Sequence, residues 1–122
     1  MWGKTTNAGQ ACVAPDYVLV PRTFQDELVM ALKEAYVPCT SPNNKFITTD
    51  LLPSHDRFYP DGPAKSESFG RIVSSRHFVR VKGLLDNTKG TIVFGGESDA
   101  DTKYIAPTVV KDVKTNDSLM SE

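Results

Sequence analysis

Cys12 is the residue in this sequence whose surroundings best suit covalent chemistry. It follows the segment Asn7-Ala8-Gly9-Gln10-Ala11 and directly precedes an apolar run. A thiolate is a good nucleophile, Gly9 would let the backbone approach a ligand, and the Cys12 N–H could face a developing oxyanion. Spacing alone is a weak signal, because a lone cysteine is more often inert and buried. Cys12 is therefore the candidate nucleophile, with Asn7, Gly9 and Gln10 as candidate supporting residues.

The remaining cysteine and the histidines show no metal-ligand pattern. Cys12, Cys39, His55 and His77 are scattered, without the short paired spacing that a zinc site needs. Two cysteines are also too few for a disulfide scaffold, which favours reduced thiols in an intracellular protein. We therefore expect no metal site, no role for Cys39 and a structural role for His77.

Two further motifs have plain structural interpretations. Arg71, Arg76, Arg80 and Lys82 form a small basic cluster with no acidic residue between them. A solvated helix face is the expected interpretation, with a contact to a cofactor phosphate as the alternative. Gly95-Gly96 predicts a turn, because two glycines do not make a phosphate-binding loop.

Composition describes one modest domain without a charge bias. The chain has 122 residues, 39% of them apolar, and its 14 basic and 15 acidic side chains give a net charge of −1. That balance removes the electrostatic case for binding nucleic acid or anionic lipid. The sequence has no 18-residue apolar run and no apolar signal core after Met1, so we expect no membrane or targeting segment.

The elements expected to follow the cysteine are a strand and a helix. Tyr17–Val20 is β-branched and aliphatic between Pro15 and Pro21, which predicts a short buried strand. Thr23 should cap a helix over Phe24–Ala35. This helix carries one apolar stripe at helical spacing, formed by Phe24, Leu28, Ala31, Leu32 and Ala35.

A second helix and further strands are expected after residue 69. Ser74 or Ser75 should cap a helix that ends at about Asn87. Its apolar side would be formed by Phe78, Val81, Leu84 and Leu85. Thr91–Phe94 predicts a buried strand, and Glu97–Lys103 predicts a loop. Tyr104–Val113 favours β-structure, with Pro107 at an edge or a bulge. The order of helices and strands along the chain is that of an α/β fold. It predicts half of such a fold rather than a closed one.

Residues 37–57 differ from the rest of the chain in composition and in periodicity. The stretch is rich in Pro, Ser, Thr and Asn, and no helical or strand periodicity survives in it. A loop of this length is uncommon inside a compact domain. We expect an insertion or a disordered loop, either a surface insertion or translated non-coding sequence.

The segment Trp2–Tyr17 closely resembles the catalytic-cysteine motif of aldehyde dehydrogenases. Ala14-Pro15-Asp16-Tyr17 after the cysteine is similar to the class 3 and fatty-aldehyde branch. The resemblance covers nearly the whole chain except about Val37–Arg57, and it continues in Phe69–Val73, Arg76–Phe78, Gly95–Glu97 and Tyr104–Val109. Thr5 and Ala11 depart from the family pattern beside the site, which leaves the substrate preference of that branch open.

The resemblance implies a mechanism and an architecture. Cys12 would attack the aldehyde carbonyl to give a thiohemiacetal, with the oxyanion held by the Cys12 N–H and an Asn side chain. Hydride transfer to NAD or NADP would give a thioester, and a Glu would activate water to release the carboxylic acid. Residues 1–122 would form part of the catalytic domain, an α/β fold with an incomplete sheet and flanking helices. The full-length enzyme would be a homodimer.

In the family, the nucleotide-binding domain, the oxyanion Asn and the general-base Glu precede the cysteine motif. We therefore expect no cofactor-binding residue in this chain and no turnover by the 122-residue chain alone. One alternative is a non-catalytic truncated product that associates through exposed strand edges, and another is a cofactor-independent thiol esterase. An intracellular, cytoplasmic location is expected, with membrane association through a further C-terminal segment as the alternative.

Overall fold

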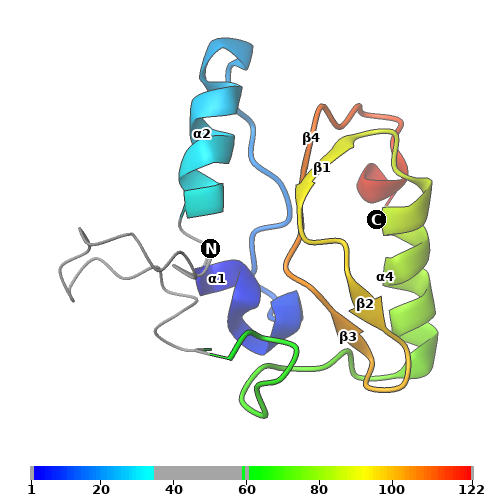
Figure 1. The fold of residues 1–122 in the computed structure, drawn as a ribbon. Helices are drawn as coiled ribbons and strands as arrows, with labels where there is room; N and C mark the ends of the chain where they lie inside the picture. Colours follow the sequence, from blue (N-terminus) through cyan, green and yellow to red (C-terminus); the bar gives the residue numbers. More distant parts are fainter. Residues whose placement is uncertain (1, 35–58, 60, 122) are drawn as a thin grey trace, which may run out of the picture.

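The structure, a computed structural model, describes residues 2–34, 59 and 61–121 (Figure 1). The predicted insertion at 37–57 lies outside the described residues. The described elements, in chain order, are α1 (Trp2–Thr5), η1 (Thr6–Gly9), α2 (Arg22–Glu34), α4 (Ser75–Asn87), β1 (Thr91–Phe94), β2 (Ser98–Asp99), β3 (Tyr104–Ile105), β4 (Val109–Lys111) and η3 (Ser118–Met120).

The described strands form two small antiparallel sheets. β1 pairs with β4, with Ile92 opposite Val110, and the register shifts between Ile92 and Phe94. β2 pairs with β3 as a short hairpin. Pro107, predicted at an edge or a bulge, lies in the break between β3 and β4, where no ladder needs its missing N–H. In Figure 1, α4 lies on one side of these strands and α2 on the other.

The predicted helix over α4 is confirmed. Ser74 is its cap, because the hydroxyl accepts a hydrogen bond from the His77 N–H at 3.3 Å. The predicted apolar side is the side that packs, with two buried and two half-buried residues: Phe78, Leu85, Val81 and Leu84. Sequence periodicity therefore identified both this helix and its packed face.

The predicted helix over α2 is confirmed with a different start. Thr23 is not its cap, because the helix begins at Arg22 and the Phe24 N–H donates to the Pro21 carbonyl at 2.9 Å. A proline suits this place, since its fixed φ is helical and it has no N–H to leave unpaired. The predicted last residue, Ala35, lies outside the described residues. No residue of α2 is buried.

The predicted buried strand Tyr17–Val20 is wrong. Residues 14–21 have no regular structure, and Tyr17, Val18 and Leu19 are exposed, Leu19 to 89%. A strand forms where a neighbouring strand completes its backbone hydrogen bonds. None of the described strands pairs with this segment.

Two other strand predictions need correction. β1 forms where predicted but is not buried, because β4 is its single paired strand in the described part of the chain and Thr91 and Ile92 are exposed. Glu97–Lys103, predicted as a loop, contains β2. The Asp99 carboxylate ends that strand in a turn by accepting the Asp101 N–H at 3.0 Å and the Thr102 hydroxyl at 2.6 Å.

The core that contacts the N-terminal segment is a small aromatic cluster. Phe69, Tyr104 and Ala106 are buried together, and Ala8 and Tyr59 pack against them. The Phe69 ring meets the Tyr59 and Tyr104 rings edge to face, at centroid distances of 5.3 and 5.8 Å. This cluster joins the N-terminal segment, residues 59–73 and β3.

Candidate functional site: the Cys12 loop

The Cys12 loop, residues 6–13, contains three consecutive residues in the left-handed backbone region. Their φ values are 51° for Asn7, 54° for Ala8 and 77° for Gly9. Glycine adopts this conformation freely and asparagine tolerates it, whereas alanine is strained there. Such a backbone persists only where the surroundings hold it in place. The contacts around the loop are therefore part of the site.

Gln10 joins the loop to the segment just before α4. Its side-chain Nε2 donates to the carbonyl oxygens of Asn7 and Arg71, at 3.0 Å each. Its Oε1 accepts the Val73 N–H at 3.0 Å. The carboxamide thus uses both donors and one acceptor on backbone groups. A shallow hollow of about 370 Å³ lies at this junction. It is lined by Asn7, Gln10, Arg71 and Val73.

Gly70 lets the chain pass close beneath the loop. A Cβ atom at this position would lie 3.0 Å from the Asn7 carbonyl carbon and 3.1 Å from the Ala8 nitrogen. Both distances are too short for a side chain without a shift of the backbone. Gly70 was missed as a site residue from sequence, although it lies in the Phe69–Val73 block that carries the family resemblance.

Arg71 stabilises the other side of this junction. Its guanidinium donates to the carbonyls of Phe69 at 3.0 Å and Ala64 at 2.7 Å, and its central carbon lies 5.2 Å from the centroid of the Tyr104 ring. Burial raises the pKa of Tyr104, Glu97 adds to the rise and Arg71 opposes it. The ring therefore stays neutral at physiological pH and acts as a packing surface.

The predicted solvated helix face is thus wrong for Arg71. This residue precedes α4, and its guanidinium donates to the backbone carbonyls of residues 63, 64 and 69 and does not extend into solvent from a helix. Arg76 and Arg80 do lie exposed on α4, and Lys82 forms an ion pair with Asp86 one turn later.

The thiol of Cys12 is free and exposed. Cys12 lies in a turn in which the Ala14 N–H donates to the Ala11 carbonyl at 2.9 Å, while its own N–H bonds to no described residue. An ion pair between Lys4 and Asp16, at 2.5 Å, ties the two ends of the surrounding segment together. An exposed thiol and an unused N–H therefore belong to the same residue of a braced loop.

The four predicted site residues have different parts in this loop. Asn7 and Gly9 form the left-handed turn, Gln10 makes the attachment, and Cys12 carries the exposed thiol. Gly95 and Gly96 both have positive φ, but the predicted turn is not found there, because these residues form an irregular link between β1 and β2. In the described part of the chain, no three His, Cys, Asp or Glu side chains are grouped as a metal site.

The described residues do not fit a nicotinamide cofactor. Its pyrophosphate usually binds free N–H groups at a glycine-rich turn between a strand and a helix. Of the two long helices described, α2 follows Pro21, and α4 has its first turn capped by Ser74. Neither start has such a turn. Separately, none of the described helices is long and apolar enough to cross a membrane.

Comparisons with known proteins agree on one family. The model of the aldehyde dehydrogenase family matches residues 1–122. The chain is 40% identical over 121 residues to the dog (Canis lupus familiaris) dimeric NADP-preferring aldehyde dehydrogenase, covering 99% of this chain and 22% of that protein. It is 44% identical over 116 residues to bovine (Bos taurus) aldehyde dehydrogenase family 3 member B1, covering 95% of this chain and 20% of that protein.

A solved structure is similar over the same length. It is the substrate-bound state of AldH from Staphylococcus aureus, with a TM-score of 0.75 and 36% sequence identity. The match covers 99% of this chain and 22% of that one. The chain thus spans about a fifth of the length of these three proteins.

Proposed function

The chain belongs to the aldehyde dehydrogenase family, and we propose that it carries the nucleophile of an enzyme that oxidises an aldehyde to a carboxylic acid. Its fold is the α/β fold of part of an aldehyde dehydrogenase chain. The observation that carries the proposal is the Cys12 loop itself, in which an exposed thiol and an unused backbone N–H lie on a braced turn.

The chemistry proposed for Cys12 is addition to the carbonyl carbon. The sulfur would form a bond to that carbon while the carbonyl π bond breaks and its electron pair moves to oxygen. The Cys12 N–H would stabilise the negative oxygen, which then takes up the proton that the thiol lost. The product is a thiohemiacetal at Cys12.

The cofactor, the partner and the location are proposals taken from the family. The dog relative is named as dimeric and NADP-preferring, which supports NAD or NADP as hydride acceptor and a homodimer for the whole protein. Hydride transfer rests on that resemblance, since the described residues do not fit the cofactor. An intracellular location and a fatty aldehyde as substrate remain part of the proposal.

The proposal is tested by observing the adduct directly. A medium-chain aldehyde labelled with ¹³C at the carbonyl should give a thiohemiacetal resonance with the folded chain, which Cys12→Ala reduces to the level of the unfolded chain and Cys39→Ala leaves. Every thiol adds weakly to aldehydes, so the chain unfolded in urea is the reference. An adduct no tighter in the folded chain than in urea would contradict the proposal.

A further inference from the structure

We propose that Gln10 is a positioning residue, which holds the Cys12 N–H in the orientation that receives the aldehyde oxygen. This inference rests on the proposed function. Gln10 reaches neither the thiol nor a substrate in the contacts described, and it would act through the backbone of the loop. Its three side-chain hydrogen bonds, to Asn7, Arg71 and Val73, carry the proposal.

Gln10 bonds to two backbone groups of one segment, at Arg71 and Val73, which are 61 and 63 residues away from it along the chain. The bond to the Arg71 carbonyl and the bond from the Val73 N–H imitate the pairing of one strand with its neighbour. The third bond, to the Asn7 carbonyl, returns to the strained turn. A single carboxamide therefore fixes the left-handed turn relative to residues 71–73.

The backbone of Gln10 is held as well as its side chain. Its N–H donates to the same Asn7 carbonyl at 3.1 Å. The turn from Ala11 to Ala14 starts at the next residue, so the position of Gln10 determines where that turn begins. The direction of the Cys12 N–H follows from it, because Cys12 is the second residue of that turn.

The other contacts of the loop are less directional. The Lys4–Asp16 pair is exposed, with 41% and 74% of the two side chains accessible, and pairs of this kind contribute little. Ala8 and Gly70 make packing contacts, which set how closely the loop approaches its neighbours but do not orient an N–H. Gln10 is therefore the residue whose loss should disturb orientation before it disturbs the fold.

The test separates access to the thiol from the use of the N–H. Gln10→Met keeps the length of the side chain and removes all three hydrogen bonds. Alkylation of Cys12 by iodoacetamide develops no carbonyl oxyanion, so its rate should change by less than about twofold. The oxygen of the adduct accepts a hydrogen bond from the Cys12 N–H, so the equilibrium constant for addition of the ¹³C-labelled aldehyde should fall by about five- to tenfold.

Gln25→Met is the matched control, because Gln25 lies on α2 and, among the described residues, its side chain forms one hydrogen bond, from Nε2 to Asp112 Oδ1 at 3.0 Å. It should leave both measurements unchanged. Circular dichroism gives the folded fraction of each variant, and both measurements are expressed per folded molecule. In Gln10→Glu, the carboxylate faces the carbonyl oxygens of Asn7 and Arg71, so this second variant should weaken the adduct at least as much.

The outcomes are distinct. A wild-type adduct that both Gln10 variants keep within twofold would overturn the positioning role and leave the proposed function standing. A parallel fall in alkylation and adduct formation would also overturn it, since access alone would then explain the loss. The absence of a folded-state adduct in the wild type would instead contradict the proposed function.

Discussion

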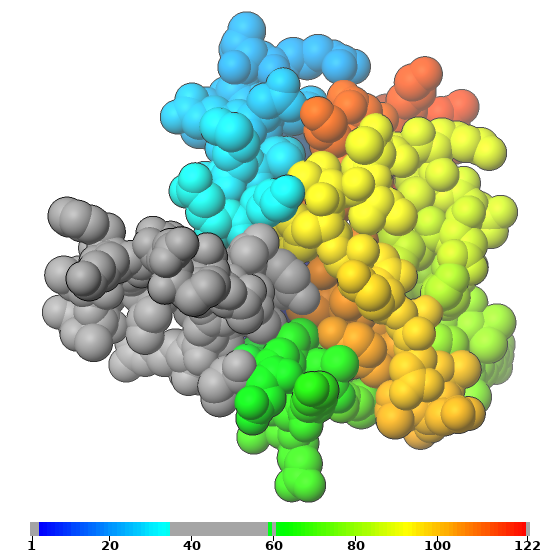
Figure 2. Space-filling view, in the orientation of Figure 1, coloured from blue at the N-terminus to red at the C-terminus, as the bar shows by residue number. Residues whose placement is uncertain are grey.

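α4 and α2 are both amphipathic helices of 13 residues, yet they are held in different ways. α4 buries Phe78 and Leu85 against its neighbours, whereas α2 buries no residue. In Figure 2, α2 (cyan) lies against the yellow surface of β1 and keeps most of its own surface open on this face. An apolar stripe therefore predicts a helix and its inner face, but it does not predict whether another element covers that face.

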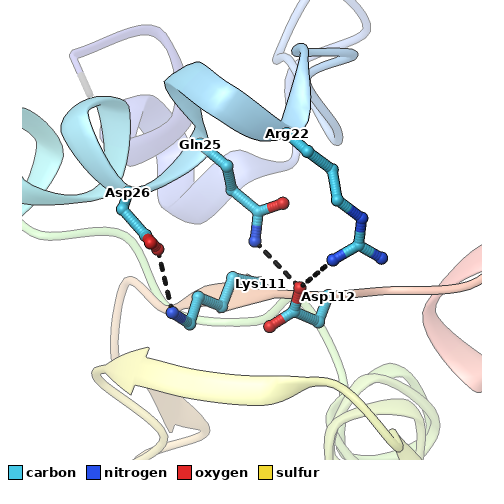
Figure 3. A network of polar contacts seen from close by, with 5 residues as sticks. All are labelled: Arg22, Gln25, Asp26, Lys111 and Asp112. Carbon is cyan, nitrogen blue, oxygen red and sulfur yellow. Dashed lines mark hydrogen bonds and ion pairs between the residues drawn. The ribbon is translucent and has the colours of Figure 1, made fainter.

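The attachment of α2 is mainly polar (Figure 3). Arg22 and Gln25 both reach Asp112, at 3.2 and 3.0 Å, and Asp26 meets Lys111 at 3.0 Å. Asp26 raises the pKa of Lys111 by hydrogen bonding and by its charge. These groups are exposed or half-exposed, and such contacts are weakened by water and salt. α2 should thus be the first helix to detach and α4 the last.

The largest effect should come from removing a buried ring of α4. Phe78 is 7% exposed, and Phe78→Ala should lower the free energy of unfolding by about 3–5 kcal/mol. Phe24 on α2 is 44% exposed, and Phe24→Ala should cost about 1 kcal/mol or less. Urea denaturation followed by circular dichroism measures both. Equal losses for the two variants would show that α2 is packed as firmly as α4.

Acid should loosen the end of α4 more than it loosens α2. The buried Asp117 carboxylate accepts hydrogen bonds from the Leu119 N–H at 3.0 Å, the Lys89 N–H at 2.7 Å and the Thr88 hydroxyl at 2.8 Å. These bonds, the one from Leu119 first, lower the pKa of Asp117 to about 2 against partial desolvation. Protonation is therefore harder in the folded chain than in the unfolded chain.

The stabilisation by Asp117 should be complete above its ordinary pKa of 3.8 and should be lost as the pH falls toward about 2. Thermal melting across this range should show a steeper decline in the wild type than in Asp117→Asn. Asp26→Asn on α2 is the control, since that carboxylate is 81% exposed. Identical slopes for wild type and Asp117→Asn would refute this role.

A further pair of predictions concerns two glycines with opposite surroundings. Gly70→Ala would crowd the Asn7 and Ala8 backbone and should destabilise the chain by about 1–3 kcal/mol. A Cβ at Gly83, inside α4, would meet nothing within 4 Å, so Gly83→Ala should stabilise by about 0.5–1 kcal/mol. Urea midpoints give both values, and a stabilising Gly70→Ala would mean that the Cys12 loop is not closely seated.

Local signals predicted the parts of the fold that depend on one segment. The serine cap and the apolar side of α4 are confirmed, since each is determined by neighbouring residues. Tyr17–Val20 failed as a strand because strand formation depends on a distant partner. The hairpin strand β2 was missed because its two residues look like loop, and Asp99 closes its turn through side-chain bonds.

The residue types of the candidate site could be predicted from the sequence, but the contacts that hold the Cys12 loop in place could not. Cys12 and its flanking residues were identified from the motif, and their roles remain predictions. The hydrogen bonds of Gln10 to residues 71–73 and the close approach at Gly70 depend on contacts across about 60 residues of chain. The inward Arg71 depends on a loop conformation that its own sequence pattern does not indicate. That the chain alone does not turn over aldehyde also stays a prediction.

The most direct test of Cys12 as the aldehyde-binding nucleophile compares the two cysteines within one sample. The folded chain is alkylated with and without aldehyde, and the modification of Cys12 and Cys39 is followed by peptide mass spectrometry. The aldehyde should slow alkylation at Cys12 and leave Cys39 unchanged, because the braced loop stabilises the adduct at Cys12 alone. Equal slowing at both cysteines, or none at Cys12, would contradict the account.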